Sequence, residues 1–152
     1  MNKVWRSISV NARMNDVYGF LVNPQNLAEV WPNLEEVKRV EQSKVNGAYD
    51  FEAEFQIADR KLRAKAQSVD AQQYDHLSIK TEKDLESTID WKLAPIGGRS
   101  TKITLQFDYR TPKDAADQEG THALVKETER GVDEMLKNLK SRVEAERPFA
   151  KA

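Results

Sequence analysis

An amphipathic segment near the C-terminus, Thr121 to Glu146, sets the first limit on the possible folds of this chain. Apolar or small side chains recur in it at steps of mostly three or four residues, which is the spacing of one helical face. They are Leu124, Val125, Thr128, Gly131, Val132, Met135, Leu139 and Val143. A rise of about 1.5 Å per residue makes the predicted helix roughly 39 Å long, and Pro148 is expected to end it. A helix this long with one apolar face needs a broad apolar surface to cover it.

Gly131 lies in the middle of this predicted helix, where a glycine costs about 1 kcal/mol relative to alanine. Two interpretations explain why a glycine is placed there. The favoured one is close packing of the helix against a sheet. The other is that the missing side chain leaves room for a bound molecule.

The stretch from Leu34 to Tyr109 has a different period, because apolar residues recur there at every second position. This pattern predicts strands, and an earlier strand is predicted at residues 4–10. The later strands are expected at 34–44, 49–57, 62–68, 77–81, 87–93 and 103–109. Turns are expected at Asn46-Gly47, Asp59-Arg60, Lys83-Asp84 and Pro95 to Arg99, with a loop from Asp70 to Gln73. Such short connections favour antiparallel neighbours.

The orientation of some strand residues is ambiguous, and two of them are arginines. The strand at 34–44 has no clean alternation, since Val37 and Val40 are three residues apart, and a bulge or an edge position would explain that. For the same reason the orientation of Arg39 is unresolved. Arg6 shares the apolar side of the first strand. It is either a polar group facing inward or, as we favour, an edge residue that reaches water.

Two short helices are predicted after the first strand. The first contains the apolar residues between Met14 and Val22. The second follows Asn23-Pro24 and ends at Trp31-Pro32, because proline suits a first helical turn. Another helix start is predicted at Thr111-Pro112 with Asp114, and the polar segment from there to Gly120 is expected to be the most mobile part of the chain.

Length, charge and composition exclude several classes of protein. A chain of 152 residues predicts a single domain, residues 1–152. The net charge of -1 gives no general attraction to nucleic acid or to an anionic membrane. The chain has no cysteine, and it lacks both an apolar run that could span a membrane and a signal-peptide core. A cytoplasmic location is therefore expected.

The order of the predicted elements indicates an α+β fold. An antiparallel sheet of about seven strands with one apolar face would curve around the long C-terminal helix, with the two short helices after strand 1 completing the cover. This order resembles the START-like, or SRPBCC, helix-grip superfamily of polyketide cyclases, lipid-transfer proteins and the birch-pollen-allergen fold. The resemblance depends on residues 7–12, 17–21, Trp31-Pro32 and 93–101, together with the closing helix. It departs from the family pattern at Asn23, where the family usually has Asp, and at Met14, near which it often has Pro.

The resemblance implies a hydrophobic cavity between the helix and the sheet, and the inward residues agree with that expectation. Large aromatic side chains face a wall of small ones, which is the composition of a pocket for a ring system or an acyl chain. The alternative is that the small residues only admit the helix more closely. The predicted ligand-binding residues are Trp31, Tyr49, Phe51, Phe55, Ala64, Ala66, Ile79, Ile89, Trp91, Phe107, Tyr109, Thr128 and Met135.

No catalytic or metal-ligating residue can be named from the sequence. His76 and His122 are isolated, and there is no nucleophile elbow or phosphate-binding glycine loop. We therefore expect no metal and no cofactor. Arg6, Tyr49 and Tyr109 are the ionisable groups to inspect for catalysis.

Three functions compete at this point. The favoured one is binding or transport of a small hydrophobic molecule such as a lipid, quinone or polyketide-like compound. The alternative is a polyketide cyclase or aromatase-like enzyme. A protein-interaction domain ranks last, because it would need an exposed apolar patch that the sequence does not show.

Overall fold

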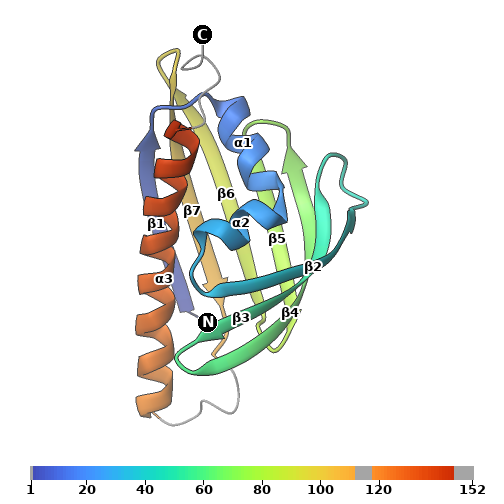
Figure 1. The fold of residues 1–152 in the computed structure, drawn as a ribbon, viewed down its shortest axis with the longest axis vertical. Coiled ribbons are helices and arrows are strands. Elements are labelled where there is room, and N and C mark those ends of the chain that lie inside the picture. The colour runs from blue at the N-terminus through green and yellow to red at the C-terminus, as the bar shows by residue number, and fades with distance from the viewer. Residues whose placement is uncertain (1, 112–117, 146–152) are drawn as a thin grey trace.

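The computed structural model describes residues 2–111 and 118–145, and the side chains of residues 118–120 are not described. Among these residues, seven strands form one antiparallel sheet (Figure 1). Their order across the sheet is β1-β7-β6-β5-β4-β3-β2. The strands are β1 (Asn2–Val10), β2 (Leu34–Gln42), β3 (Tyr49–Ile57), β4 (Arg60–Gln72), β5 (His76–Lys83), β6 (Ser87–Ile96) and β7 (Ser100–Tyr109).

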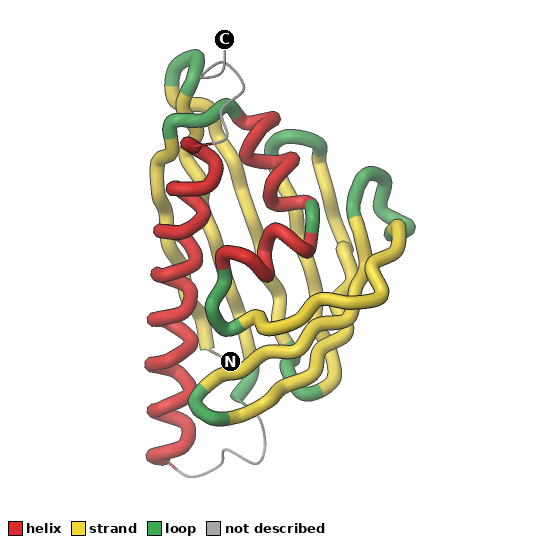
Figure 2. The backbone as a smooth tube through the Cα atoms, viewed as in Figure 1, coloured by secondary structure: helices red, strands yellow, loops and turns green. Residues whose placement is uncertain are grey.

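Within the described part of the chain, three helices cover the concave face of this sheet (Figure 1). They are α1 (Met14–Val22), α2 (Pro24–Val30) and α3 (Gln118–Ala145). Helix α3 packs along β1 and reaches β3, while α1 lies against β6 and β7 and α2 lies against β2. Strands β2 to β4 curve around the front of the molecule, so the sheet encloses the helices from one side (Figures 1 and 2). The predicted helix-grip architecture is confirmed. None of the described helices is long and apolar enough to cross a membrane.

Strand β3 shows why the sheet has one apolar face. Its inward residues Phe51, Ala53, Phe55 and Ile57 are buried, and the residues between them are partly exposed. Strict alternation of this kind places one face in the core and the other in water. The hairpin turn predicted at Asn46-Gly47 also forms, and Gly47 takes a positive φ of 79° there, which a glycine adopts at no steric cost.

Several predicted strand ends were wrong. Asp70 to Gln72 do not form a loop, because β4 continues through a bulge at Val69 and pairs with the start of β5. The polar residues of this segment gave no strand pattern in the sequence. In the continued strand, the Asp70 carboxylate lies 3.1 Å from Nδ1 of His76. The turn expected at Asp59-Arg60 is centred one residue earlier, where Ala58 and Asp59 both have positive φ.

Strand β2 has both features that its irregular pattern allowed. It is an edge strand, and its pairing with β3 shifts register twice. Val37 is buried and Val40 is exposed. Arg39 has a φ of 54° and points outward to Glu52, with 2.8 Å between guanidinium and carboxylate. The bulge therefore turns this arginine away from the interior.

Helix α3 begins at Gln118, three residues before the predicted start, so part of the segment expected to be mobile is helical. The predicted helix start at Thr111-Pro112 with Asp114, and the stop at Pro148, lie outside the described residues apart from Thr111. The apolar stripe of α3 is buried as expected except at Val125, which is half-buried, and it also includes Leu136, which the sequence analysis did not identify.

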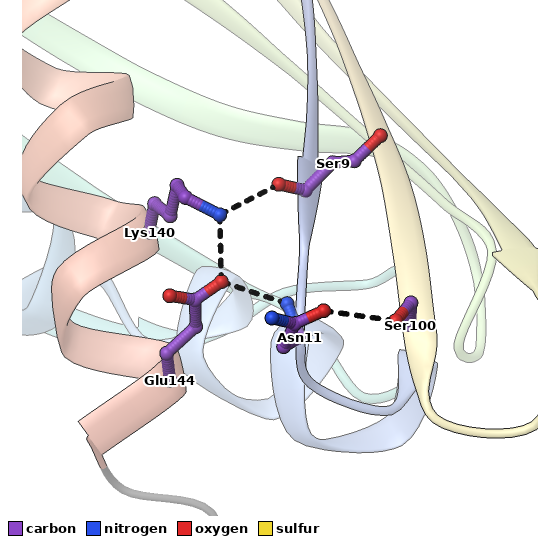
Figure 3. Close-up of polar contacts among 5 residues, drawn as sticks. All are labelled: Ser9, Asn11, Ser100, Lys140 and Glu144. Atoms are coloured by element: carbon purple, nitrogen blue, oxygen red, sulfur yellow. Dashed lines mark hydrogen bonds and ion pairs between the residues drawn. The ribbon is translucent and has the colours of Figure 1, made fainter.

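A polar network holds the C-terminal half of α3 against the end of β1 (Figure 3). Lys140 Nζ donates to the carbonyl of Ser9 at 3.0 Å and pairs with Glu144 at 2.7 Å. The Glu144 carboxylate accepts from the backbone N–H of Asn11 at 2.8 Å, and the Ser100 hydroxyl donates to the Asn11 side chain at 3.1 Å. The network joins α3, the end of β1 and the start of β7.

Candidate functional site

Most of the predicted ligand-binding residues lie in the core between the sheet and the helices. Twelve of the thirteen are buried, with exposed fractions from 0% at Ala66 and Met135 to 6% at Phe51. Tyr49 is the exception, because it starts β3 and is only half-buried. Sequence patterning therefore grouped these side chains correctly in space, while their role in binding stays a prediction.

Four aromatic rings form a continuous cluster in this interior. Trp31, at the end of α2, makes edge contacts with Phe55 at 5.2 Å and with Phe107 at 5.6 Å between ring centroids. Phe107 in turn stacks on Tyr109 at 5.1 Å and an interplanar angle of 28°. Trp31 was expected either to line a pocket mouth or to cap the core, and it is fully enclosed, with 2% of its surface exposed.

The small inward residues gather in the middle of the sheet. Ala53 on β3 pairs with Ala64 on β4, and Ala66 pairs with Thr81 on β5. On its other side Ala66 pairs with Phe51 of β3, so the short side chains lie directly next to a large ring. A patch of short side chains beside a cluster of large rings is the asymmetry expected of a site for a flat or chain-like guest.

Gly131 serves close packing rather than space for a guest. A Cβ placed at Gly131 would lie 1.5 Å from Oδ1 of Asn33, so an added side chain would collide with that amide. The packing partner is the link between α2 and β2 rather than the sheet itself. Asn33 is fixed there, because its Nδ2 donates to the carbonyl of Gln56 and its own carbonyl accepts from the Gln56 N–H. The sequence analysis did not identify Asn33, although its position after Trp31-Pro32 marked it as a link residue.

Three aromatic side chains of the interior carry a polar atom without a hydrogen-bond partner in the described part of the chain: Trp31 Nε1, Trp91 Nε1 and the Tyr109 hydroxyl. Each belongs to a side chain with at most 2% of its surface exposed. Buried polar groups without partners are rare, and each one calls for a physical explanation.

Tyr109 also has a perturbed acidity. Burial raises the pKa of its hydroxyl above the ordinary value of 10.0; the side chain of Thr128 partly opposes the rise, and the charge of Glu129 adds to it. Thr128 donates its own proton to the carbonyl of Leu124, and it forms no hydrogen bond of ordinary geometry with Tyr109. The phenol therefore keeps its proton at neutral pH.

The other candidate ionisable groups do not reach the interior. Arg6 lies on β1 at the sheet edge and pairs with Asp133 on α3 at 2.8 Å, with both side chains at least one third exposed. This confirms the edge interpretation of Arg6. Of the three groups named for inspection, only Tyr109 is fully enclosed.

Solved structures share this fold at low sequence identity. The Zhui aromatase/cyclase from Streptomyces sp. R1128 superimposes with a TM-score of 0.78 at 16% identity, over 94% of this chain and 93% of that one. A START superfamily protein from Mycobacterium smegmatis gives 0.77 at 11% identity, over 94% and 97%. TTHA0849 from Thermus thermophilus gives 0.76 at 15% identity, over 95% and 98%. No curated protein sequence matches the chain.

The sequence itself matches a family model over almost its whole length. The model describes the polyketide cyclase / dehydrase and lipid transport proteins, and the match covers residues 1–144. The recognition of a START-like fold from the sequence is thus confirmed by an independent comparison. The chain belongs to the polyketide cyclase / dehydrase and lipid transport family.

Proposed function

We propose that this protein binds or carries a small hydrophobic molecule between the concave face of the sheet and the N-terminal half of α3. The observation that carries the proposal is the enclosed aromatic cluster of Trp31, Phe55, Phe107 and Tyr109 beside a patch of short side chains. Apolar and aromatic walls with a few polar groups are the usual lining of a small-molecule site. Membership in a family of cyclases and lipid-transport proteins supports the same function.

Binding requires movement inside the protein. Ala66 and Met135 have no exposed surface, so not even a water molecule can touch them in this form. A guest must therefore displace neighbouring side chains, or part of α3, instead of entering a void that already exists at these residues. The proposal includes a cytoplasmic location and no nucleic-acid partner, both of which depend on composition and charge alone.

The direct test is to identify a bound small molecule. Native mass spectrometry and organic extraction of protein purified without detergent should reveal a bound apolar species. A compound from a hydrophobic library that binds should raise the melting temperature by roughly 2 to 4 °C for each kcal/mol by which it stabilises the folded protein.

A matched pair of variants locates the site. Ala66→Leu adds bulk to a fully buried position on β4, and Ala94→Leu adds the same bulk to an exposed position on β6. We expect A66L to abolish binding and A94L to leave it unchanged, with circular dichroism checking that both variants fold. Absence of any bound species and of any thermal shift in the unmodified protein would end the proposal.

An enzymatic function of the cyclase or aromatase kind is the second candidate. Its specific support is Tyr109, an ionisable group enclosed at the predicted site and protonated at neutral pH. A lone phenol can hold or give a proton to a substrate oxygen, yet general acid–base chemistry works best with a pKa near the operating pH. Turnover of a polyketide-like substrate that is lost in Tyr109→Phe would favour this alternative over simple binding.

A further inference from the structure

One end of the convex face of the sheet differs in charge from the rest. Over β3, β4 and β5 the outward side chains mix both signs, and Lys65 has Glu52 and Glu82 as its cross-strand neighbours. Over β1, β7 and β6, the outward residues between Trp5 and the β6–β7 turn include lysines but no carboxylate. We call this area the tip face. It consists of Trp5, Lys92, Ala94, Ile96 and Lys102, with small hydroxyl side chains between them.

The two lysines of the tip face are neighbours. Lys92 pairs with Thr104 and Lys102 pairs with Ala94, so the two lysines lie diagonally across β6 and β7. Diagonal neighbours on one face of a sheet are about 7 to 8 Å apart. Within the described part of the chain, neither lysine forms an ion pair. Arg99 in the β6–β7 turn is a further exposed cation.

Two carboxylates border the tip face, and both already have partners. Asp90 lies two residues before Lys92 on β6, and its carboxylate is 2.7 Å from Nε2 of His76. Glu144 on α3 pairs with Lys140 at 2.7 Å. The positive charge of the tip face is therefore left for something outside the described chain to balance.

The tip face also exposes large apolar side chains. Ile96 is 45% exposed and Trp5 is 57% exposed, which is unusual for side chains of this size. The β6–β7 hairpin that carries Ile96 extends beyond α1 at one end of the molecule (Figure 1). Ile96 lies six residues along β6 from Asp90, which shares a row of the sheet with Trp5, so the tip face is about 20 Å long.

We propose that the tip face docks on an anionic lipid bilayer. Ile96 and Trp5 enter the headgroup region, where the amphipathic indole ring is favoured. Lys92 and Lys102 extend along the surface and contact lipid phosphates, since basic clusters are attracted to anionic leaflets. A nucleic-acid strand would use the lysines but leave Ile96 in water. The surface is separate from the proposed interior site, and the inference does not depend on that site.

Vesicle co-sedimentation at low ionic strength tests the docking. The two probes are vesicles of phosphatidylcholine alone and vesicles that also contain phosphatidylglycerol. The protein should bind the anionic vesicles about tenfold or more tightly than the neutral ones, because at least two lysines face the lipid. Added salt should weaken this binding. Equal binding to the two kinds of vesicle, or no binding to the anionic ones, would overturn the proposal.

A matched pair of charge reversals locates the docking surface. Lys92→Glu with Lys102→Glu should lower the affinity for anionic vesicles by more than tenfold. Lys61→Glu with Lys80→Glu makes the same change in net charge at exposed lysines of β4 and β5, and it should lower the affinity far less. Circular dichroism checks that both double variants fold. Equal losses in the two variants would show that only the overall charge matters and would overturn the assignment of the tip face.

An apolar pair and the fluorescence of Trp5 test the insertion. Ile96→Asp should weaken binding several-fold, whereas Val69→Asp, at a 49% exposed position on β4, should not. Of the three tryptophans, Trp31 and Trp91 are buried and Trp5 is exposed. Brominated phosphatidylcholine in the anionic vesicles should therefore quench the emission of the unmodified protein, and Trp5→Phe should remove this quenching.

The remaining outcomes separate a bilayer from other partners. Binding to anionic vesicles without quenching by brominated lipid would overturn the insertion of Trp5. If a single-stranded RNA oligonucleotide binds more tightly than the anionic vesicles, and K92E with K102E abolishes that binding, the tip face is a nucleic-acid surface and the proposal is wrong. The vesicle and quenching measurements use the unmodified protein, so they decide the question even if a variant does not fold.

Discussion

The two halves of α3 meet the rest of the protein in different ways. The C-terminal half, residues 136–145, combines buried Leu136, Leu139 and Val143 with hydrogen bonds to three other parts of the chain. These bonds reach the end of β1, the link to α1 and the carbonyl of Val30 on α2. The described N-terminal half, residues 121–135, is held mainly by packing, with the exposed Arg6–Asp133 pair joining it to β1.

This difference separates a structural region from a candidate functional one. The half held by hydrogen bonds fixes the position of the helix on the sheet. The half held by packing faces Tyr109 and contains Thr128 and Met135, both predicted to bind the ligand. A contact made of apolar atoms can open without leaving many buried polar groups unpaired. We therefore expect any movement that admits a guest to occur in the N-terminal half.

The largest loss of stability is expected from a cavity in the C-terminal half. Leu139 has no exposed surface, so Leu139→Ala should lower the free energy of unfolding by about 3 kcal/mol. Chemical denaturation measures this value. Ser141→Ala, an exposed change on the same half, should stay within about 0.5 kcal/mol of the unmodified protein. Similar values for both variants would contradict the assigned role of this half.

The next effect concerns the close contact in the N-terminal half. Gly131→Ala gains helix propensity but forces a Cβ into Asn33, so we expect a net loss of about 1 to 2 kcal/mol. Gly19→Ala is the control, because a Cβ there meets no atom within 4 Å, and it should stabilise α1 by about 0.5 to 1 kcal/mol.

A double-mutant cycle identifies the partner of Gly131. The variant that combines G131A with Asn33→Ala should lose less than the sum of the two single losses, since the collision is removed. If the two losses of stability were strictly additive, the strain in G131A would not come from contact with Asn33.

A smaller effect is expected from the polar network of Figure 3. Lys140 is 46% exposed and Glu144 is 26% exposed, so solvent screens their ion pair. Lys140→Met together with Glu144→Gln should cost about 1 kcal/mol or less, and the cost should shrink at high salt. Amide hydrogen exchange should nevertheless rise at Asn11, whose N–H donates to Glu144. Unchanged exchange at Asn11 would show that the network does not hold the helix end.

The smallest effect near neutral pH comes from Tyr109. Because its folded-state pKa is raised, its contribution to stability is complete below the unfolded value of 10.0 and declines as pH rises toward the folded value. Stability should therefore fall at alkaline pH, and Y109F should reduce that fall. Denaturation midpoints at several pH values above about 9 provide the measurement. Tyr18, whose pKa is also raised by burial and by the charge of Asp75, contributes in the same direction.

Residue patterning predicted the sheet, the short helices and the long helix because each element has a clear apolar period. It placed twelve of the thirteen chosen side chains in the interior for the same reason. It missed the continuation of β4 through Val69, since a bulge breaks the alternation. It also missed Asn33, because a contact between a link residue and a helix glycine leaves no local pattern. The unpaired donors of Trp31 and Tyr109 depend on three-dimensional packing, so the sequence could not reveal them.

The most direct test of the proposed site is methionine-methyl NMR with 1-acetonaphthone. The chain has three methionines, of which Met135 is buried at the predicted site and Met14 begins α1. We predict a saturable shift of the Met135 methyl resonance, with contacts to the naphthalene ring, and no comparable change at Met14. If the probe saturates the protein while the Met135 resonance stays fixed, the guest does not bind between the sheet and α3.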